Sequence, residues 1–266
     1  MTETSTQPRN RLVIALDVET RANACALVDQ LRELVGWFKI GSQLFTAEGP
    51  ELVRELVRRD VKVFLDLKFH DIPSTVAKAG IEATRLGVAM FNVHAMGGAE
   101  MMRAVADAVS EMAEREGLQR PVILAVTLLT SLGPNDVKQI FIAERIENVV
   151  TGLARLASES GLDGVVCSPQ EAMLIRHHVN RPDFVILTPG IRPSWAAAQD
   201  QKRVLTPTEA LQEGADYIVV GRPVTDHADP AAAARRILEE IEAFERQPDQ
   251  PIGRYPNYAQ FGPRDY

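Results

Sequence analysis

The sequence predicts a protein of the α/β class folded as a single (β/α)8 barrel, the TIM-barrel architecture. Eight short apolar runs rich in β-branched residues alternate with longer amphipathic segments, an arrangement that requires parallel strands joined by helical crossovers. The chain has 266 residues and is 45% hydrophobic, enough for one large core. No linker rich in Gly, Ser or Pro divides it, which favours one barrel over two smaller domains.

The expected strands and helices follow each other along the chain. Strands are expected at Leu12–Leu16, Trp37–Ile40, Val61–Leu65, Val88–Val93, Val122–Val126, Gly164–Cys167, Val185–Leu187 and Tyr217–Val220. Helices are expected at Ala22–Leu34, Glu51–Arg59, Val76–Leu86, Ala99–Ala113, Arg145–Ser160 and Pro230–Phe244. An open doubly wound sheet is the alternative, because periodicity does not show closure, although no Gly-rich dinucleotide motif follows the first strand.

The domain boundaries follow from the same pattern. Residues 11–246 are expected to form the catalytic barrel, after a polar N-terminal segment of residues 1–10. Residues 247–266 contain several prolines and aromatic residues and are expected to be an irregular tail, which could lie on the outside of the barrel or on a partner.

Composition excludes several classes of protein. The net charge of −7 argues against nucleic-acid binding through overall positive charge, so any phosphate site must be local. The two cysteines, Cys25 and Cys167, are too far apart in sequence to suggest a zinc site or a disulfide scaffold, and a reducing cytoplasm fits them best. The N-terminus has no apolar signal core, and the longest apolar stretch, Val122–Leu129, is too short to span a bilayer. A soluble protein with no membrane partner is therefore expected.

Charged residues stand at the ends of the first three predicted strands. Asp17 follows the first strand, Lys39 lies in the second, and the third runs into Asp66, Lys68 and Asp71. In a (β/α)8 barrel the catalytic residues come from the carboxyl ends of the strands. Because strand side chains alternate between faces, Asp66 and Lys68 share one face, and Lys39 points inward if its apolar neighbours pack against helices. Opposite charges fixed in a partly desolvated cleft cost free energy to assemble, so they indicate a functional site.

Each of these residues also has a structural interpretation when it is taken alone. Asp17 could be a loop carboxylate or a helix cap, Lys39 a lysine that extends from the edge of the core, and Asp71 the cap of the next helix. His70 and His94 are interpreted as structural or supporting residues. As a set, however, charged residues at three neighbouring strand ends are an improbable coincidence for a purely structural rim.

The last two predicted strands lead into a candidate phosphate site. Gly221 and Arg222 follow the eighth strand directly, and Gly190 and Arg192 follow the seventh. In this fold these two loops commonly bind phosphate, through backbone N–H groups near a glycine and through a bidentate arginine. The alternative is a turn glycine beside an exposed arginine. The polar segment from Arg192 to Arg203 is long enough to act as a lid over such a phosphate.

Several motifs, in one order from about residue 11 to residue 245, carry a resemblance to a known family. They are Ala15-Leu16-Asp17, Phe38-Lys39-Ile40-Gly41, Asp66-Leu67-Lys68-Phe69-His70-Asp71-Ile72-Pro73, Asn92-Val93-His94-Ala95, Val126-Thr127-Leu128-Leu129-Thr130-Ser131, Thr188-Pro189-Gly190-Ile191-Arg192-Pro193, Asp200-Gln201 and Gly221-Arg222-Pro223. With these motifs the chain closely resembles the orotidine 5'-monophosphate decarboxylases, in particular their bacterial branch. The third motif is the most specific, although a short Asp-x-Lys match also occurs in related sugar-phosphate decarboxylases. The tail and the segment Trp195-Ala196-Ala197-Ala198 depart from the family pattern.

The resemblance implies a role for each matched residue. Lys68, Asp66, Asp71 and Lys39 would be catalytic, and Asp17 and Lys39 would hold the ribose hydroxyls. The other implied substrate-binding residues are Ile72, Thr75, Thr130, Arg192, Gln201, Gly221 and Arg222, of which Thr130 would contact the pyrimidine and the last four the phosphate. Family members are homodimers with shared sites, so Asp71, Ile72 and Thr75 would reach into the neighbouring subunit.

The expected reaction is the decarboxylation of orotidine 5'-monophosphate to UMP in pyrimidine biosynthesis, without metal or cofactor. The ammonium of Lys68 would stabilise the carbanion at C6 and then protonate it. One alternative is a magnesium-dependent decarboxylase or aldolase of sugar phosphates, in which the resemblance implies a glutamate at the position of Lys39. A second alternative is a non-catalytic barrel that binds a nucleotide phosphate as a sensor or an assembly module.

Overall fold

Eight parallel strands close into a barrel in the computed structural model, which describes residues 7–196 and 205–246. Neighbouring strands pair in chain order, and β1 pairs with both β2 and β8. The strands are β1 (Leu12–Ala15), β2 (Trp37–Gly41), β3 (Lys62–Phe69), β4 (Met90–His94), β5 (Val122–Val126), β6 (Gly164–Val166), β7 (Val185–Thr188) and β8 (Tyr217–Val220). The predicted (β/α)8 barrel is confirmed, and the open sheet is ruled out.

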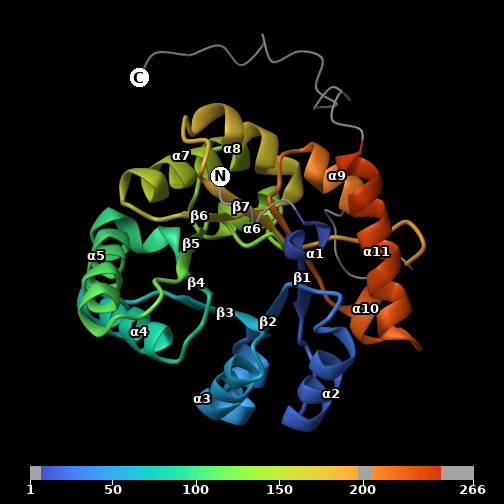
Figure 1. Cartoon of the computed structure of the whole chain (residues 1–266). Coiled ribbons are helices and arrows are strands. Elements are labelled where there is room, and N and C mark those ends of the chain that lie inside the picture. The colour runs from blue at the N-terminus through green and yellow to red at the C-terminus, as the bar shows by residue number, and fades with distance from the viewer. Residues whose placement is uncertain (1–6, 197–204, 247–266) are drawn as a thin grey trace.

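Helices surround the barrel on its outside (Figure 1). The longer ones are α2 (Arg21–Leu31), α3 (Ser42–Arg58), α4 (Pro73–Arg85), α5 (Gly98–Glu116), α7 (Ile146–Glu159) and α11 (Pro230–Glu245). All were predicted, but α3 begins at Ser42 instead of Glu51 because helix forms on both sides of a kink at Gly49, where φ is 66°. Among the described residues no helix combines the length and the apolar character needed to cross a bilayer.

Several short helices were not predicted from the sequence. They are α1 (Pro8–Arg11), α6 (Pro134–Gln139), α8 (Ala172–His178), α9 (Pro207–Gln212), α10 (Arg222–Thr225) and the 3-10 turns η2 (Ala95–Gly97) and η3 (Pro169–Glu171). Each is too short for an apolar period of 3.6 residues to stand out from its surroundings.

The apolar residues form two layers separated by the strands. Leu12 and Ile14 of β1 belong to the larger core between the barrel and its helices, whereas Val13 and Ala15 belong to the barrel interior. The buried interior residues are Val13, Ala15, Trp37, Phe64, Met90, Leu124, Val126, Val166, Leu187 and Val219. Since strand side chains alternate, every second residue of a strand contributes to this interior.

The same alternation carries polar residues to the open end of the barrel. A step of two residues leads from Ala15 to Asp17, from Trp37 to Lys39 and from Phe64 to Asp66. The strands that fill the interior with apolar side chains therefore place charged side chains directly above it.

The glycine of β6 permits a close approach between two strands. A Cβ atom on Gly164 would lie 2.1 Å from the carbonyl oxygen of Val185 and 2.7 Å from its Cβ. Both atoms belong to the paired strand β7, so the clash is relieved only by moving a strand of the barrel. We predict that Gly164→Ala lowers the free energy of unfolding by about 3 kcal/mol, as measured by urea denaturation.

Gly152 provides a matched control for this substitution. It is exposed in the middle of α7, and a Cβ there would meet nothing within 4 Å. Gly152→Ala is expected to raise the free energy of unfolding by about 0.5–1 kcal/mol, because alanine favours helix more than glycine does. Equal effects of the two substitutions would contradict the proposed contact at Gly164.

Candidate active site

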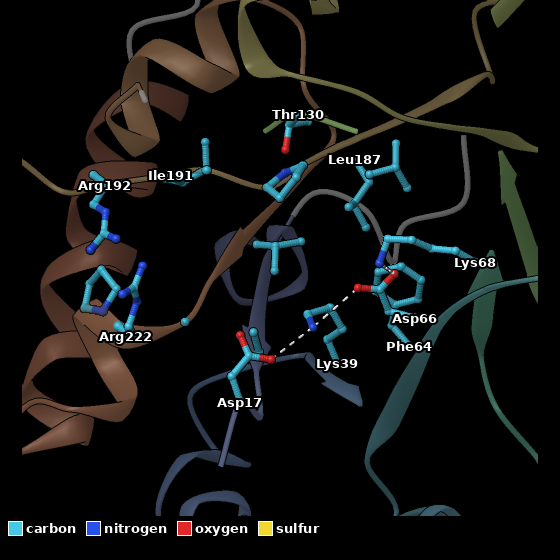
Figure 2. A pocket seen from close by; sticks show the side chains of 17 residues that line it. Asp17, Lys39, Phe64, Asp66, Lys68, Thr130, Leu187, Ile191, Arg192 and Arg222 are labelled. Atoms are coloured by element: carbon cyan, nitrogen blue, oxygen red, sulfur yellow. Dashed lines mark hydrogen bonds and ion pairs between the residues drawn. The ribbon is translucent and has the colours of Figure 1, made fainter. Parts of the chain in front are cut away.

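A cleft of about 280 Å³ opens at the carboxyl ends of the strands. Its floor consists of interior side chains, namely Ala15, Phe64, Val166, Leu187 and Val219. Its rim carries Asp17, Lys39, Asp66, Lys68, Thr130, Arg192, Gly221 and Arg222, all of them predicted site residues (Figure 2). A mostly apolar base with a few convergent polar groups is typical of a small-molecule site.

Four of these side chains form a chain of alternating charge. The ammonium of Lys39 lies 3.2 Å from Asp17 Oδ1 and 3.4 Å from Asp66 Oδ2, and Lys68 Nζ lies 2.7 Å from Asp66 Oδ1. The two central members are the most protected, with 12% of the Lys39 side chain and 14% of the Asp66 side chain exposed. The predicted cluster at the ends of β1, β2 and β3 is thus brought together, and burial reduces the screening of its charges by solvent.

Asp66 is held in its ionised form by its neighbours. Burial on its own would raise the pKa of this carboxyl, but the ammonium groups of Lys39 and Lys68 and the hydrogen bonds from Lys68 and Asn92 outweigh it. The net pKa of Asp66 is therefore below its ordinary value. At neutral pH the site holds a largely buried carboxylate between two cations.

Lys68 has a backbone conformation that the sequence did not predict. Its φ is 53°, in the left-handed region, and the pairing of β3 with β4 shifts register between Leu65 and Phe69. β3 was expected to end at Leu65, but it continues through this irregularity to Phe69. Lys68 and Asp66 meet as predicted, although an irregular strand and not simple alternation brings them together.

Asn92 is a site residue that sequence reasoning missed. It is fully buried in β4, where its side chain accepts a hydrogen bond from the backbone N–H of Lys68 and donates one to Asp66 Oδ1. The sequence did contain a signal, namely a single amide side chain within the apolar run Val88–Val93. A buried amide needs hydrogen-bond partners, so it indicates other polar groups nearby.

His70 and His94 stack at the edge of this cluster. Their ring centroids are 5.1 Å apart with an angle of 21° between the rings, and Nδ1 of His94 accepts a hydrogen bond from the backbone N–H of Met96. Burial, together with the charges of His70 and Lys68, lowers the pKa of His94 below its ordinary value. A neutral ring held in this way agrees with the structural interpretation of the pair.

The structure gives Asp17 and Asp71 no role as helix caps. The side chain of Thr20 caps α2, and α4 begins after Ile72 without a capping side chain. The Asp71 carboxylate instead accepts a hydrogen bond from the N–H of Ile72. Asp71, Ile72 and Thr75 are all exposed and do not line the described part of the cleft, unlike the other predicted site residues that the structure describes.

Two arginines face each other on the opposite side of the cleft. Arg192 follows β7, Arg222 follows β8, and their guanidinium groups point toward one another (Figure 2). The backbone of Arg192 is fixed by its N–H, which donates to the carbonyl of Leu205. Two cations that converge in this way create a site for an anion.

The predicted lid lies only partly within the described structure. Arg192–Ala196 are described, and in this part the Trp195 ring packs against the guanidinium of Arg236 on α11, at 4.3 Å from the ring centroid. Gln201, predicted as a phosphate ligand, and its neighbours Gln199 and Asp200 fall outside the described residues, as does the tail from residue 247.

A second cleft, of about 380 Å³, lies among residues that precede β1, β7 and β8, at the other end of the barrel. Its arginines are engaged within the chain. Arg11 pairs with Glu245 and Arg176 with Asp216. These cations already have carboxylate partners, which makes them less available to an anionic ligand.

Comparisons with known proteins cover most of the chain. Residues 10–237 match the family model described as Orotidine 5'-phosphate decarboxylase / HUMPS family. The chain is 51% identical over 237 residues to a protein of Syntrophotalea carbinolica named orotidine 5'-phosphate decarboxylase, a match that covers 89% of this chain and 97% of that one. It is 50% identical over 240 residues to the Geobacter sulfurreducens protein of the same name, covering 90% and 99%.

A solved structure with the same name is also similar to this chain. The crystal structure of orotidine 5'-phosphate decarboxylase from Lactobacillus acidophilus superposes with a TM-score of 0.77 at 33% sequence identity, covering 87% of this chain and 99% of that one.

The balance of forces at Asp66 leads to a prediction about its pKa. Lys39→Met removes one of the two cations, so the pKa of Asp66 should rise, as measured by carbon NMR of the carboxyl during a pH titration. In the double variant Lys39→Met/Lys68→Met burial prevails, and the pKa should exceed its ordinary value. An unchanged pKa in both variants would contradict this account.

The same shift predicts how stability depends on pH. Because the pKa of Asp66 is lower in the folded chain than in the unfolded chain, its ionised form adds stability above about pH 4. This contribution is lost as the pH falls through the lowered folded pKa, and it is smaller in Lys39→Met. Lys62→Met is the control, since Lys62 lies at the opposite end of the same strand and is exposed.

Proposed function

The chain belongs to the orotidine 5'-phosphate decarboxylase / HUMPS family, and from this premise we infer that it is the carboxy-lyase that converts orotidine 5'-monophosphate to UMP in pyrimidine biosynthesis. The main structural support for this function is the row of alternating charges above an apolar floor, formed by Asp17, Lys39, Asp66 and Lys68. It offers a fixed ammonium at a site that also has room for a pyrimidine ring.

The chemistry explains why an ammonium is needed. When the bond between C6 and the carboxylate carbon breaks, carbon dioxide leaves and the electron pair stays on C6 in an orbital that the ring does not delocalise. The barrier therefore falls only if charge is stabilised from outside the ring. In our proposal Lys68 provides this stabilisation and then donates a proton to C6, which gives UMP, and it regains a proton from solvent.

The neighbouring charges position this ammonium. Asp66 accepts a hydrogen bond from Lys68 Nζ at 2.7 Å, and Lys39 balances the second oxygen of the same carboxylate. In the proposed complex, Lys39 and Asp17 also hold the ribose hydroxyls, since both lie at the rim of the cleft. The substrate carboxylate would enter a site that already holds the Asp66 carboxylate, which favours its departure as neutral carbon dioxide.

The phosphate is assigned to the opposite wall of the cleft. We propose that it lies between Arg192 and Arg222, close to the backbone of Gly221, and that Gln201 adds a further contact. Two guanidinium groups that converge from the loops after β7 and β8 offer several N–H donors to one phosphate, which supports this position. Thr130, on the same rim, would contact the pyrimidine. Binding energy from a phosphate distant from C6 is then available to desolvate the reacting group.

The charge pattern favours this reaction over a magnesium-dependent one. Asp17 and Asp66, the carboxylates that could hold a divalent ion, both lie beside the ammonium of Lys39. A metal ion there would have to displace or neutralise a cation already in place. Decarboxylation is therefore expected to persist in EDTA, whereas a metal-dependent sugar-phosphate enzyme would lose its activity.

A homodimer with shared sites is the proposed assembly. The exposed side chains Asp71, Ile72 and Thr75 stand at the start of α4 and could reach a second copy. Ile72 is 63% exposed and Met96 is 44% exposed, so both apolar side chains are available for contact with a second copy. In such a dimer, the partner subunit's Asp71 would complete the network around Lys68. A reducing cytoplasm is the proposed location, since both cysteines are thiols.

The first test is to follow the ultraviolet absorbance of orotidine 5'-monophosphate after purified protein is added, with and without EDTA. Lys68→Ala should lower kcat by more than about 10³-fold because it removes both the charge and the proton donor. Lys62→Ala, at the other end of β3, should keep the wild-type rate. Wild-type protein that leaves the absorbance unchanged would point to a nucleotide-binding barrel without catalysis.

Shared sites add a second part to this experiment. Asp71→Ala should also be nearly inactive, but mixing it with Lys68→Ala should restore about a quarter of the wild-type activity, since half of the dimers are mixed and each has one intact site. Mixing Lys68→Ala with Asp66→Ala should restore nothing, because both residues come from the same subunit. Equal recovery in the two mixtures would refute the shared site.

Arg222 allows a separate test of the phosphate position. Arg222→Ala should weaken UMP binding by about 10²-fold while changing uridine binding little, because uridine lacks the phosphate. Isothermal titration calorimetry with both ligands measures the difference. Arg155→Ala on the outer helix α7 is the control, and an equal loss of affinity for UMP and uridine would place the phosphate elsewhere.

A further inference from the structure

Asn92 connects the two strands that carry the central charges. It lies in β4 and is 0% exposed. Its side chain makes two hydrogen bonds to β3: Nδ2 donates to Asp66 Oδ1 at 2.7 Å, and Oδ1 accepts from the backbone N–H of Lys68 at 2.8 Å. One amide therefore contacts both the carboxylate that orients Lys68 and the backbone of Lys68 itself.

The orientation of this amide is determined by its partners. The carboxylate of Asp66 is ionised and only accepts hydrogen bonds, so it must face the Asn92 NH₂ group. The backbone N–H of Lys68 only donates, so it must face the Asn92 oxygen. No other side chain of this size offers a donor and an acceptor side by side, since aspartate lacks the donor when ionised and leucine lacks both.

The bond to Lys68 coincides with an irregularity in the strand. Regular pairing between β3 and β4 ends at Leu65 and resumes at Phe69. Within this gap Lys68 has a φ of 53°, a conformation that is unfavourable for residues other than glycine. Its N–H therefore points to a side chain in place of a strand backbone, and Asn92 provides the acceptor.

We propose that Asn92 is a positioning residue for the decarboxylation, an inference that rests on the proposed function. It stabilises the left-handed conformation of Lys68 and directs Oδ1 of Asp66, so that the Lys68 ammonium is held where C6 would lie. Because the amide reaches the substrate only through Asp66 and Lys68, its loss affects kcat and not the binding of the nucleotide.

The experiment compares Asn92→Leu and Asn92→Asp with wild type. Asn92→Leu keeps the branched shape and the number of heavy atoms but makes neither hydrogen bond. Its kcat should fall about 10²-fold while UMP affinity changes less than about threefold. Thr84→Val is the matched control, since it removes a buried hydrogen bond from Thr84 to the Gly80 carbonyl in α4. It should lower Tm but leave kcat and its pH profile unchanged.

Asn92→Asp separates positioning from a general structural role. A protonated carboxyl donates to Asp66 and accepts from Lys68 as the amide does, but its ionised form repels Asp66. Two carboxyl groups that share one site raise the pKa of one of them, so the ratio of variant to wild-type kcat should be highest at low pH and fall as the pH rises. The charged and titratable groups around this position are Asp66, Lys68, Lys39 and His94. Wild type and Asn92→Leu carry the same groups without the new carboxyl, so comparison with both isolates its effect. The ratio for Asn92→Leu should not rise toward low pH, because this variant adds no carboxyl group.

The outcomes distinguish this inference from the function on which it rests. If wild-type protein does not decarboxylate orotidine 5'-monophosphate, the function fails and the inference fails with it. If wild type is active but Asn92→Asp gives a ratio that does not change with pH, or Asn92→Leu keeps its kcat, only the role of Asn92 is overturned. A loss of Tm and UMP affinity together with kcat in Asn92→Leu would also overturn it, in favour of a purely structural role.

Discussion

The Asp66 carboxylate is the interaction on which the site depends. A buried carboxylate costs several kcal/mol unless charge and hydrogen bonds offset the loss of water. Here Lys39, Lys68 and Asn92 all direct donors or positive charge to its two oxygens. Each contact also fixes the position of the partner. The Asp66 carboxylate is therefore stabilised by Lys39, Lys68 and Asn92, and it positions them in turn.

The barrel makes this arrangement rigid. The central charged residues lie on strands or directly after them, and the side chains below them fill the barrel interior. Lys39 and Asp66 cannot move far without disturbing the interior residues Trp37 and Phe64, two positions earlier in their strands. Charges held in advance need little reorganisation during a reaction, which is the main advantage that a folded site has over water.

Most of the fold was predictable from local patterns. Each strand is an apolar run whose length and composition differ from those of the amphipathic helices on either side of it in the sequence. The parallel order follows from the helices between the strands. The meeting of Asp17, Lys39 and Asp66 followed from the same reasoning, because neighbouring strands of a barrel end on one side. The predicted contacts with a nucleotide and with a second copy remain predictions, since they depend on molecules beyond the single chain.

The unpredicted features arise from strand register. Asn92 reaches Asp66 only because Leu65 pairs with Phe91 and the pairing then shifts before Phe69. Register depends on contacts between strands far apart in sequence, so no local pattern reveals it. The left-handed backbone at Lys68 has the same origin, since a lysine shows no intrinsic preference for it.

Closure of the barrel also limits how copies of the chain can associate. Every strand of the described barrel has a partner on both sides, so its sheet presents no row of unsatisfied backbone groups to which a foreign strand could attach. Contacts between molecules must then be made by side chains of loops and helices, whose identity can change without breaking the sheet. A strand of another molecule therefore cannot extend the native barrel into an amyloid-like sheet, whereas the surface residues can still change in sequence.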